Sequence, residues 1–175
     1  LSELRDQTLI AGATDLAIED ASGMAWLADG ARVIGVRPAL NAIFQVPMIA
    51  PPGEPLGQFV ALAAHGDALY ALDAARGRVL SIDPQGRILQ VFGEGTLRMP
   101  HAIAVDRRRR VFIADRFDQT LHVFRDGRPL AVITAAALGV LEICDLRVHD
   151  DDLAIADSLA ARVHLFRLLA DRAGP

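Results

Sequence analysis

Three residues combine side chains that bind cations or transfer protons with a regular placement along the chain. Asp15, His101 and Asp145 each stand near the start of a short apolar segment, at successive separations of 86 and 44 residues. Carboxylate and imidazole groups brought together can ligate a divalent cation, Ca²⁺ or Zn²⁺, or act as acid and base around a small substrate. The alternative, which we favour, is that the three residues line a water-filled channel of the fold and form hydrogen bonds with backbone groups, with no cofactor bound.

Many other catalytic chemistries are excluded by residues that the sequence lacks. All 18 basic residues are arginine, so there is no lysine for a Schiff base, a P-loop or a Ser-Lys pair. Cys144 is the only cysteine, which excludes an internal disulfide and a cysteine-rich zinc site. The G-x-S-x-G motif of many hydrolases is absent as well. The sequence therefore favours a noncatalytic protein over an enzyme.

Two charged clusters are a second candidate for function, as a surface that binds a partner. They are Arg107, Arg108, Arg109 and Arg110, and Asp150, Asp151 and Asp152. Arginine binds carboxylate or phosphate in a bidentate manner, so the clusters could dock a protein or peptide, or pair two identical chains. Alternatively they screen each other, since exposed ion pairs contribute only about 0–1 kcal/mol. Nucleic acid is not an expected partner, because the net charge is −4 and no aromatic residues interleave the arginines.

An internal repeat supplies the elements that would position these residues. Four apolar runs close on an aspartate, with spacings of 44, 42 and 42 residues: Asp29, Asp73, Asp115 and Asp157. Each run is accompanied by two or three more short apolar segments, rich in Val, Ile, Leu and Phe and bounded by Gly, Asp, Pro or Arg. Such segments indicate strands. Four antiparallel strands every ~42 residues are typical of one blade of a β-propeller.

The sequence accordingly predicts an all-β protein, a single β-propeller domain over residues 1–175. Its four blades are expected at about residues 12–46, 58–92, 99–133 and 143–168. The fourth blade has only three predicted strands, and the apolar segment 8–11 could complete it, which would close a small ring by strand exchange. The alternative is that the four blades are part of a larger propeller.

One repeat carries a family pattern. The segment MPHAIAVD at residues 99–106, followed by VFIAD at 111–115 and LHVF at 121–124, resembles an NHL repeat. The resemblance extends over about residues 8–168 and implies a propeller of four-stranded blades, of which NHL domains usually have six. It also implies a noncatalytic scaffold that mediates protein or peptide interaction.

The same resemblance implies an alternative function, a metal-dependent lactonase- or lyase-like enzyme with its site in the central channel. In the amidating-lyase branch of these propellers, the histidine that matches His101 is a zinc ligand. In lactonase-type propellers the ligands are mostly carboxylate and amide groups, which resemble Asp15 and Asp145 more closely.

Comparison of the repeats with one another separates structural residues from functional candidates. The aspartate that recurs at the end of the second strand is expected to cap the following turn by accepting its backbone N–H bonds. His122 and His164 occupy equivalent third-strand positions, where we expect them to pack against the core.

Composition places the chain among folded proteins, with 52% hydrophobic residues and no apolar run long enough for a membrane span. NHL-like bacterial propellers are often exported, and the absence of lysine beside abundant Arg and Ala indicates a GC-rich genome. We therefore expect a bacterial protein of the periplasm or the extracellular space.

Overall fold

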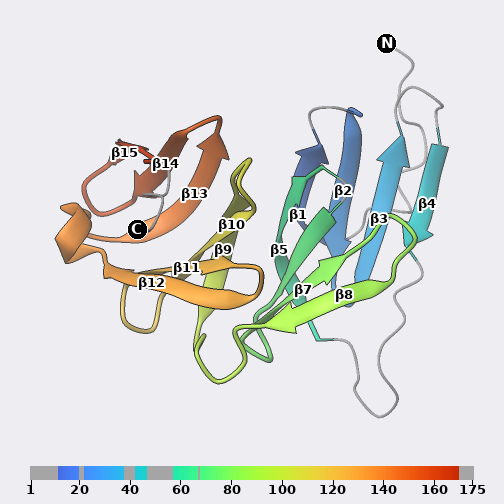
Figure 1. Ribbon diagram of the computed structural model, residues 1–175, viewed down its shortest axis with the longest axis horizontal. Helices are drawn as coiled ribbons and strands as arrows, with labels where there is room; N and C mark the ends of the chain where they lie inside the picture. Colours follow the sequence, from blue (N-terminus) through green and yellow to red (C-terminus); the bar gives the residue numbers. More distant parts are fainter. Residues whose placement is uncertain (1–11, 20–21, 38–41, 47–56, 67, 170–175) are drawn as a thin grey trace, which may run out of the picture.

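The strands of the computed structural model form four antiparallel sheets that follow one another along the chain (Figure 1). The structure describes residues 12–19, 22–37, 42–46, 57–66 and 68–169. The first sheet contains β1 (Ala13–Glu19), β2 (Met24–Asp29), β3 (Arg32–Arg37) and β4 (Ala42–Val46). The second contains β5 (Phe59–His65), β6 (Ala68–Asp73), β7 (Arg78–Ile82) and β8 (Ile88–Phe92).

The third sheet contains β9 (Pro100–Val105), β10 (Arg110–Asp115), β11 (Thr120–Arg125) and β12 (Arg128–Thr134), and a short 3₁₀ helix, η3 (Ala136–Leu138), follows it. The described part of the fourth sheet has three strands, β13 (Ile143–His149), β14 (Asp152–Asp157) and β15 (Arg162–Arg167). In each sheet the strands pair in chain order. The predicted closing strand at residues 8–11 lies outside the described residues.

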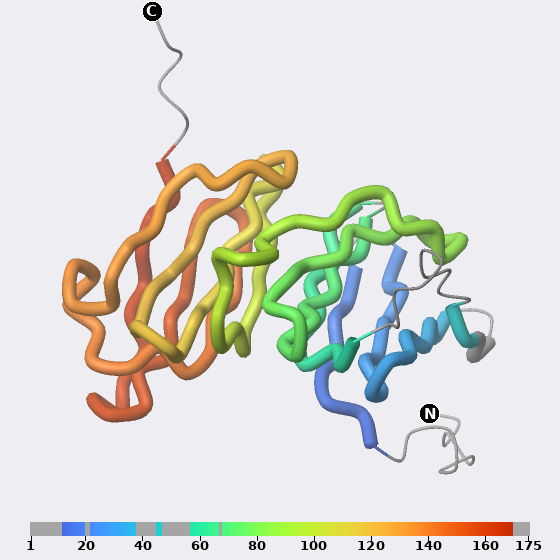
Figure 2. Tube along the Cα trace, turned by 90° about the horizontal axis from the view of Figure 1, so that it is seen from below, coloured from blue at the N-terminus to red at the C-terminus, as the bar shows by residue number. Residues whose placement is uncertain are grey.

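These sheets are the blades of a four-blade β-propeller, as the repeat predicted. We number them blades 1 to 4 in chain order. The first strand of each blade is the innermost one, and β1 contacts β5, β5 contacts β9, and β9 contacts β13. Two perpendicular views place blades 1 and 4 toward opposite ends of the molecule, with blades 2 and 3 between them (Figures 1 and 2).

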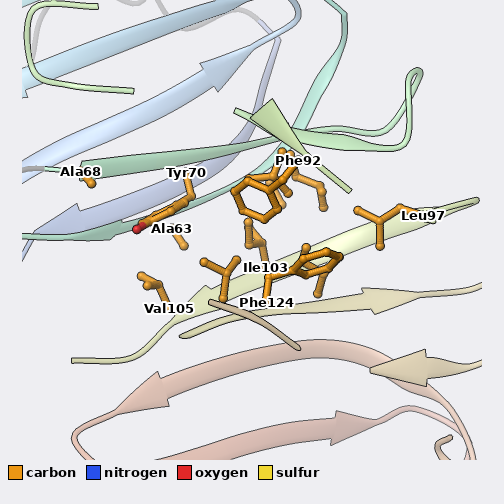
Figure 3. Close-up of a cluster of buried hydrophobic side chains, with 13 residues drawn as sticks. Ala63, Ala68, Tyr70, Phe92, Leu97, Ile103, Val105 and Phe124 are labelled. Atoms are coloured by element: carbon orange, nitrogen blue, oxygen red, sulfur yellow. The ribbon is translucent and has the colours of Figure 1, made fainter. Parts of the chain in front are cut away.

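Apolar clusters fill the junctions between successive blades. Between blades 2 and 3, Tyr70 and Phe92 face Ile103 and Phe124 (Figure 3), and all four side chains are buried. The Phe92 and Phe124 rings lie 5.2 Å apart between centroids. Similar clusters join blade 1 to blade 2 and blade 3 to blade 4. Burial between two blades explains why the middle strands β6 and β10 are apolar along nearly their whole length.

Every innermost strand is interrupted by a β-bulge one residue after its start. In β9 the bulge lies between the pairs Pro100–Asp115 and Ala102–Ala114 and leaves His101 out of the ladder. The other three innermost strands show the same shift in register, at Thr14, Val60 and Cys144. A bulge changes the direction of one side chain relative to the rest of the strand. These four bulge residues are therefore structurally equivalent to one another and distinct from the paired residues of their strands.

No helix in the described part of the chain has the length and apolar character needed to cross a bilayer.

Candidate functional site

The four innermost strands line a half-open central cavity of about 130 Å³. Its lining comes from one segment of each blade, residues 16–18, 62–64, 103–105 and 147–148. Arg147 is the one charged residue among them, and the others are Ala, Leu, Ile and Val. The cavity is therefore small and half open, and its exposed surface is mostly polar although its side chains other than Arg147 are apolar.

The strand register separates His101 from the two aspartates with which the sequence aligned it. Asp15 and Asp145 are equivalent, because they pair with Ala28 and Ala156, which precede the last residue of β2 and of β14. His101 instead is the bulge residue, one position earlier in its strand. The predicted equivalence of the three residues is wrong, because a bulge cannot be recognised in an ungapped comparison of repeats.

The two aspartates share one arginine. Arg147 Nη1 lies 2.9 Å from Asp145 Oδ1, and Arg147 Nη2 lies 3.8 Å from Asp15 Oδ1. Asp15 Oδ2 also accepts a hydrogen bond of 2.7 Å from the Leu62 backbone N–H, in the next blade. The positive charge that faces both carboxylates is thus supplied by the chain itself.

His101 makes an interblade hydrogen bond. Its Nε2 donates to the Ile143 carbonyl of blade 4 at 2.9 Å. Thr14, the bulge residue of blade 1, does the same, since its hydroxyl donates to the Phe59 carbonyl of blade 2 at 2.9 Å. Phe59 and Ile143 are equivalent residues, each paired with the aspartate that ends the second strand. The bulge side chain therefore joins neighbouring blades in two of the three junctions.

The environment of His101 favours a neutral ring. Burial lowers the pKa of His101, and the nearby Arg116 charge lowers it further, while the hydrogen bond to Ile143 and two aspartates act in the opposite direction. The proton is on Nε2, because a carbonyl oxygen can only accept. Nδ1 is buried without a hydrogen-bond partner in the described structure.

Among the described residues, no three His, Cys, Asp or Glu side chains come together in a group that could hold a metal ion. Asp15, His101 and Asp145 are each engaged in the contacts given above. The metal site inferred from the sequence thus stays a prediction, and the residues present do not form a ligand set for it.

The aspartates that end the second strands are structural, but they act in two ways. Asp115 accepts hydrogen bonds from the backbone of Phe117 in the following turn, and from Arg98 and Met99 in the loop before β9. Asp157 does the same for Ala160 and for the loop residues at 141–142. These two confirm the predicted turn cap.

In blades 1 and 2 the aspartate that ends the second strand forms an ion pair with an arginine. Asp29 pairs with Arg32, and Asp73 pairs with Arg78 at 3.1 Å. For Asp157, burial alone would raise the pKa, but the backbone N–H groups of Leu141, Ala160 and Glu142 together with His164 lower it to about 2.

The two histidines that were expected to pack against the core lie against phenylalanine rings. His122 stacks on Phe124, and His164 stacks on Phe166.

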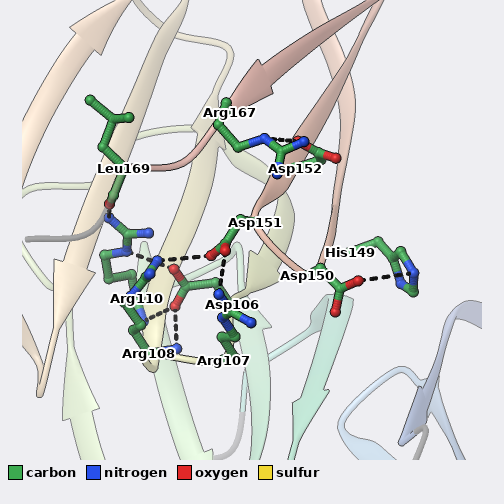
Figure 4. Close-up of polar contacts among 10 residues, drawn as sticks. All are labelled: Asp106, Arg107, Arg108, Arg110, His149, Asp150, Asp151, Asp152, Arg167 and Leu169. Carbon is green, nitrogen blue, oxygen red and sulfur yellow. Dashed lines mark hydrogen bonds and ion pairs between the residues drawn. The ribbon is translucent and has the colours of Figure 1, made fainter.

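The two charged clusters lie side by side and pair with each other (Figure 4). Arg107 and Arg108, in the turn between β9 and β10, both contact the Asp151 carboxylate, which lies in the equivalent turn of blade 4. Asp152 pairs with Arg167 at 2.8 Å, and Asp150 lies 3.8 Å from His149. Most of the rim charge predicted to bind a partner is thus engaged within the chain.

Arg110 does not belong to this surface. Its side chain is buried, its Nε lies 2.6 Å from the buried Asp106 carboxylate, and its Nη1 donates to the Leu169 carbonyl at 3.1 Å. Asp106 also accepts the backbone N–H bonds of Arg108 and Arg110. The fourth arginine of the run therefore stabilises the turn, whereas Arg107 and Arg109 are exposed.

The structure also shows a feature that the sequence did not reveal, an apolar concavity of about 430 Å³ between blades 1 and 2. Its lining residues come from both blades: Glu19, Ser22, Met24, Trp26, Arg37, Gly66, Ala68, Leu69 and Pro84. Trp26 is the only tryptophan of the chain, and this singular residue was the one sequence signal that could have indicated the site. The polar residues in the lining include Glu19, whose carboxylate accepts from the Ser22 backbone.

The propeller fold is shared with many solved structures. U3-55K aligns with a TM-score of 0.66 at 14% identity, over 94% of this chain and 54% of its own. Hydrazine synthase of Kuenenia stuttgartiensis gives 0.61 at 14%, over 97% and 52%. The computationally designed Ika4 protein gives 0.66 at 13%, over 95% and 96%. The chain thus spans about half the length of the natural structures and nearly all of the designed one.

A scan against protein-family models and a search of curated proteins give no match for this sequence. The structural similarity concerns the fold, because the identities are all low.

Proposed function

We propose that this chain is a noncatalytic NHL-type propeller scaffold that binds a protein or peptide through the apolar concavity between blades 1 and 2. The observation that carries this proposal is the concavity itself. At about 430 Å³ it is within the usual range of ligand pockets, roughly 300–1,000 Å³. The central cavity, at about 130 Å³, falls below that range.

The lining suits an apolar side chain presented by a partner. Met24, Trp26 and Leu69 are almost fully buried and form an apolar floor, and Glu19 and Arg37 are polar residues of the lining. Buried aromatic residues surrounded by polar groups are typical of the energetic centre of protein interfaces. The expected ligand is therefore a peptide segment with one large apolar anchor, such as leucine, methionine or phenylalanine.

Support also comes from the kind of protein that shares the fold. Two of the similar structures are described as WD40 repeats of RRP9 and as a WD40 propeller domain of Doa1. This similarity supports a role in protein interaction for the present chain. A fold does not determine a function by itself. For that reason the proposal rests on the concavity rather than on the similarity.

A lactonase- or lyase-like enzyme is the less favoured proposal. It would place a metal among Asp15, His101 and Asp145, where Arg147 faces both carboxylates and His101 donates to a backbone carbonyl. These contacts engage both carboxylates and His101 Nε2 without a ligand, while His101 Nδ1 has no hydrogen-bond partner among the described residues.

The experiment selects peptides from a phage-displayed library on the immobilised protein and measures their binding in solution. Trp26 reports directly on the concavity, because no other tryptophan contributes to the fluorescence. Selected peptides should change the Trp26 emission in a saturable way. Pro84→Glu, which adds a charge to the lining, should weaken binding by tenfold or more, about 1.4 kcal/mol.

Gln85→Glu is the matched control, since it adds the same charge to the next residue of the same exposed turn without lining the concavity. It should leave binding unchanged. If selected peptides bound both variants equally well, the concavity would not be the binding site and the proposal would fail.

A further inference from the structure

The junction between blades 2 and 3 contains a second cavity, of about 320 Å³. Blade 2 contributes Tyr70, Ser81 and Gln90 to its lining, and blade 3 contributes Arg109 and Asp126. The volume lies within the usual range of ligand pockets, roughly 300–1,000 Å³. This cavity shares only Ala68 with the concavity between blades 1 and 2, so it is a separate site.

Three polar residues of the lining form one row across blade 2, which we call the polar row. Tyr70 pairs with Ser81, and Ser81 pairs with Gln90. Residues directly opposite each other on neighbouring strands lie on the same face of a sheet. The phenol, the hydroxyl and the carboxamide therefore lie next to one another on the face of blade 2 that packs on blade 3.

No other blade has polar side chains at the first two positions of this row. Each row starts three residues before the aspartate that ends the second strand. The equivalent pairs are Trp26 with Gly35 in blade 1, Phe112 with Val123 in blade 3, and Ala154 with Leu165 in blade 4. Blade construction thus does not require hydroxyl groups here, and the polar row is a candidate for function.

The Ser81 hydroxyl is a buried polar group that gains from an occupant of the cavity. Ser81 is only 6% exposed, and its hydroxyl makes no hydrogen bond within the described part of the chain. A hydroxyl buried without a partner is unfavourable for the fold. Because Ser81 lines the cavity, a ligand bound there could supply the missing hydrogen bond.

Gln90 is held in place at the edge of the cavity. Its Nε2 donates to the Asp126 carbonyl of blade 3 at 2.9 Å, which orients the carboxamide and leaves Oε1 as an acceptor. The geometry requires glycine at position 127, where φ is +71° and a Cβ atom would lie 2.0 Å from Gln90 Nε2. The polar row is therefore oriented before any ligand binds.

The charges of the lining balance, which favours a neutral ligand. Arg109 and Asp126 lie in two turns of blade 3 and carry opposite charges. Hydroxyl and carboxamide groups can each donate and accept hydrogen bonds, so the polar row matches a ligand with several hydroxyl groups. Leu89 and Phe92 add apolar surface to the same lining, against which the C–H groups of a sugar ring can pack.

We propose that this cavity binds a neutral sugar, either a free monosaccharide or one sugar unit of a glycan. The site is independent of the peptide site at Trp26, so either proposal can fail without the other.

The test follows the backbone and side-chain amide groups of the wild-type chain by heteronuclear NMR. D-glucose, D-galactose, D-mannose and L-fucose are titrated in turn. At least one should shift the Gln90 side-chain amide and the Gly127 backbone amide in a saturable way, without shifting the Trp26 indole N–H. Glucuronic acid and glucosamine should bind about fivefold or more weakly, because their charge would be buried without a counterion.

Substitutions of glutamine in blade 2 provide a matched pair. Gln90→Ala should weaken sugar binding about tenfold, because it removes hydrogen bonds to the ligand. Gln85→Ala is the control, since Gln85 is exposed in the same blade but does not line the cavity, and it should leave binding unchanged. Ser81→Val introduces the residue that blade 3 has at this position and should abolish binding, with an unchanged circular dichroism spectrum.

Four results would overturn the proposal. They are the absence of saturable shifts with all four sugars, shifts centred on the Trp26 indole, equal affinity of Gln90→Ala and Gln85→Ala, and tighter binding of a charged sugar than of the neutral ones.

Discussion

The Asp15 carboxylate accepts a hydrogen bond from the Leu62 backbone N–H at 2.7 Å, and this contact joins the innermost strands of blades 1 and 2. Next to it, the Thr14 hydroxyl donates to the Phe59 carbonyl. Asp15, which the sequence analysis placed at a candidate metal site, thus helps to hold neighbouring blades together.

Loss of this contact should destabilise the protein. Asp15→Ala removes an ionised acceptor from a partly buried N–H group, which costs about 1–3 kcal/mol in the free energy of unfolding. Urea denaturation measures the change. Glu94→Ala serves as the control, because it also removes a carboxylate, at an exposed turn residue outside β1 and β5. Equal stability of the two variants would show that the interblade hydrogen bond contributes nothing.

The two sets of ion pairs near the rim should differ sharply in their contribution. Asp106 is buried and holds Arg110 together with two backbone N–H groups, so Asp106→Asn should cost about 3–5 kcal/mol. Asp151 contacts Arg107 and Arg108 at the surface, and Asp151→Asn should cost less than about 1 kcal/mol. Comparable losses in urea denaturation would contradict the distinction between the turn and the rim.

Asp157 should make stability depend on acid pH. Its pKa is lowered from 3.8 to about 2 in the folded protein, so the ionised carboxylate stabilises the fold above pH 3.8, and this contribution is lost as the pH falls toward 2. The wild type should therefore be more stable than Asp157→Asn at pH 7, by a margin that shrinks between pH 4 and pH 2. A margin that did not depend on pH in urea denaturation would show that the pKa is not lowered.

Metal analysis addresses the channel residues. Because Arg147 faces both Asp15 and Asp145, we expect protein dialysed after incubation with Ca²⁺ or Zn²⁺ to retain less than one ion per chain. Inductively coupled plasma mass spectrometry measures the number of metal ions per chain. A stoichiometric ion that disappears in His101→Ala would contradict this expectation and favour the enzyme proposal.

The fold could be predicted from the sequence because a repeat of about 42 residues leaves few alternatives. The pairing of Arg107 with Asp151 was also within reach, since equivalent turns of neighbouring blades lie on the same rim. The position of His101 was not, because a bulge shifts one residue without any change in composition. The concavity at Trp26 could not be predicted either, since its walls come from two blades whose packing no single repeat describes.

In each innermost strand the bulge residue is under a different constraint from the residues that pair with the second strand. Its residue lies outside the ladder, so it can be exchanged while every other side chain of the strand keeps its face. The chain already holds four unlike side chains there, those of Thr14, Val60, His101 and Cys144. A single substitution at any of these four places changes the group presented there without shifting the strand register, and at Thr14 and His101 it also removes an interblade hydrogen bond.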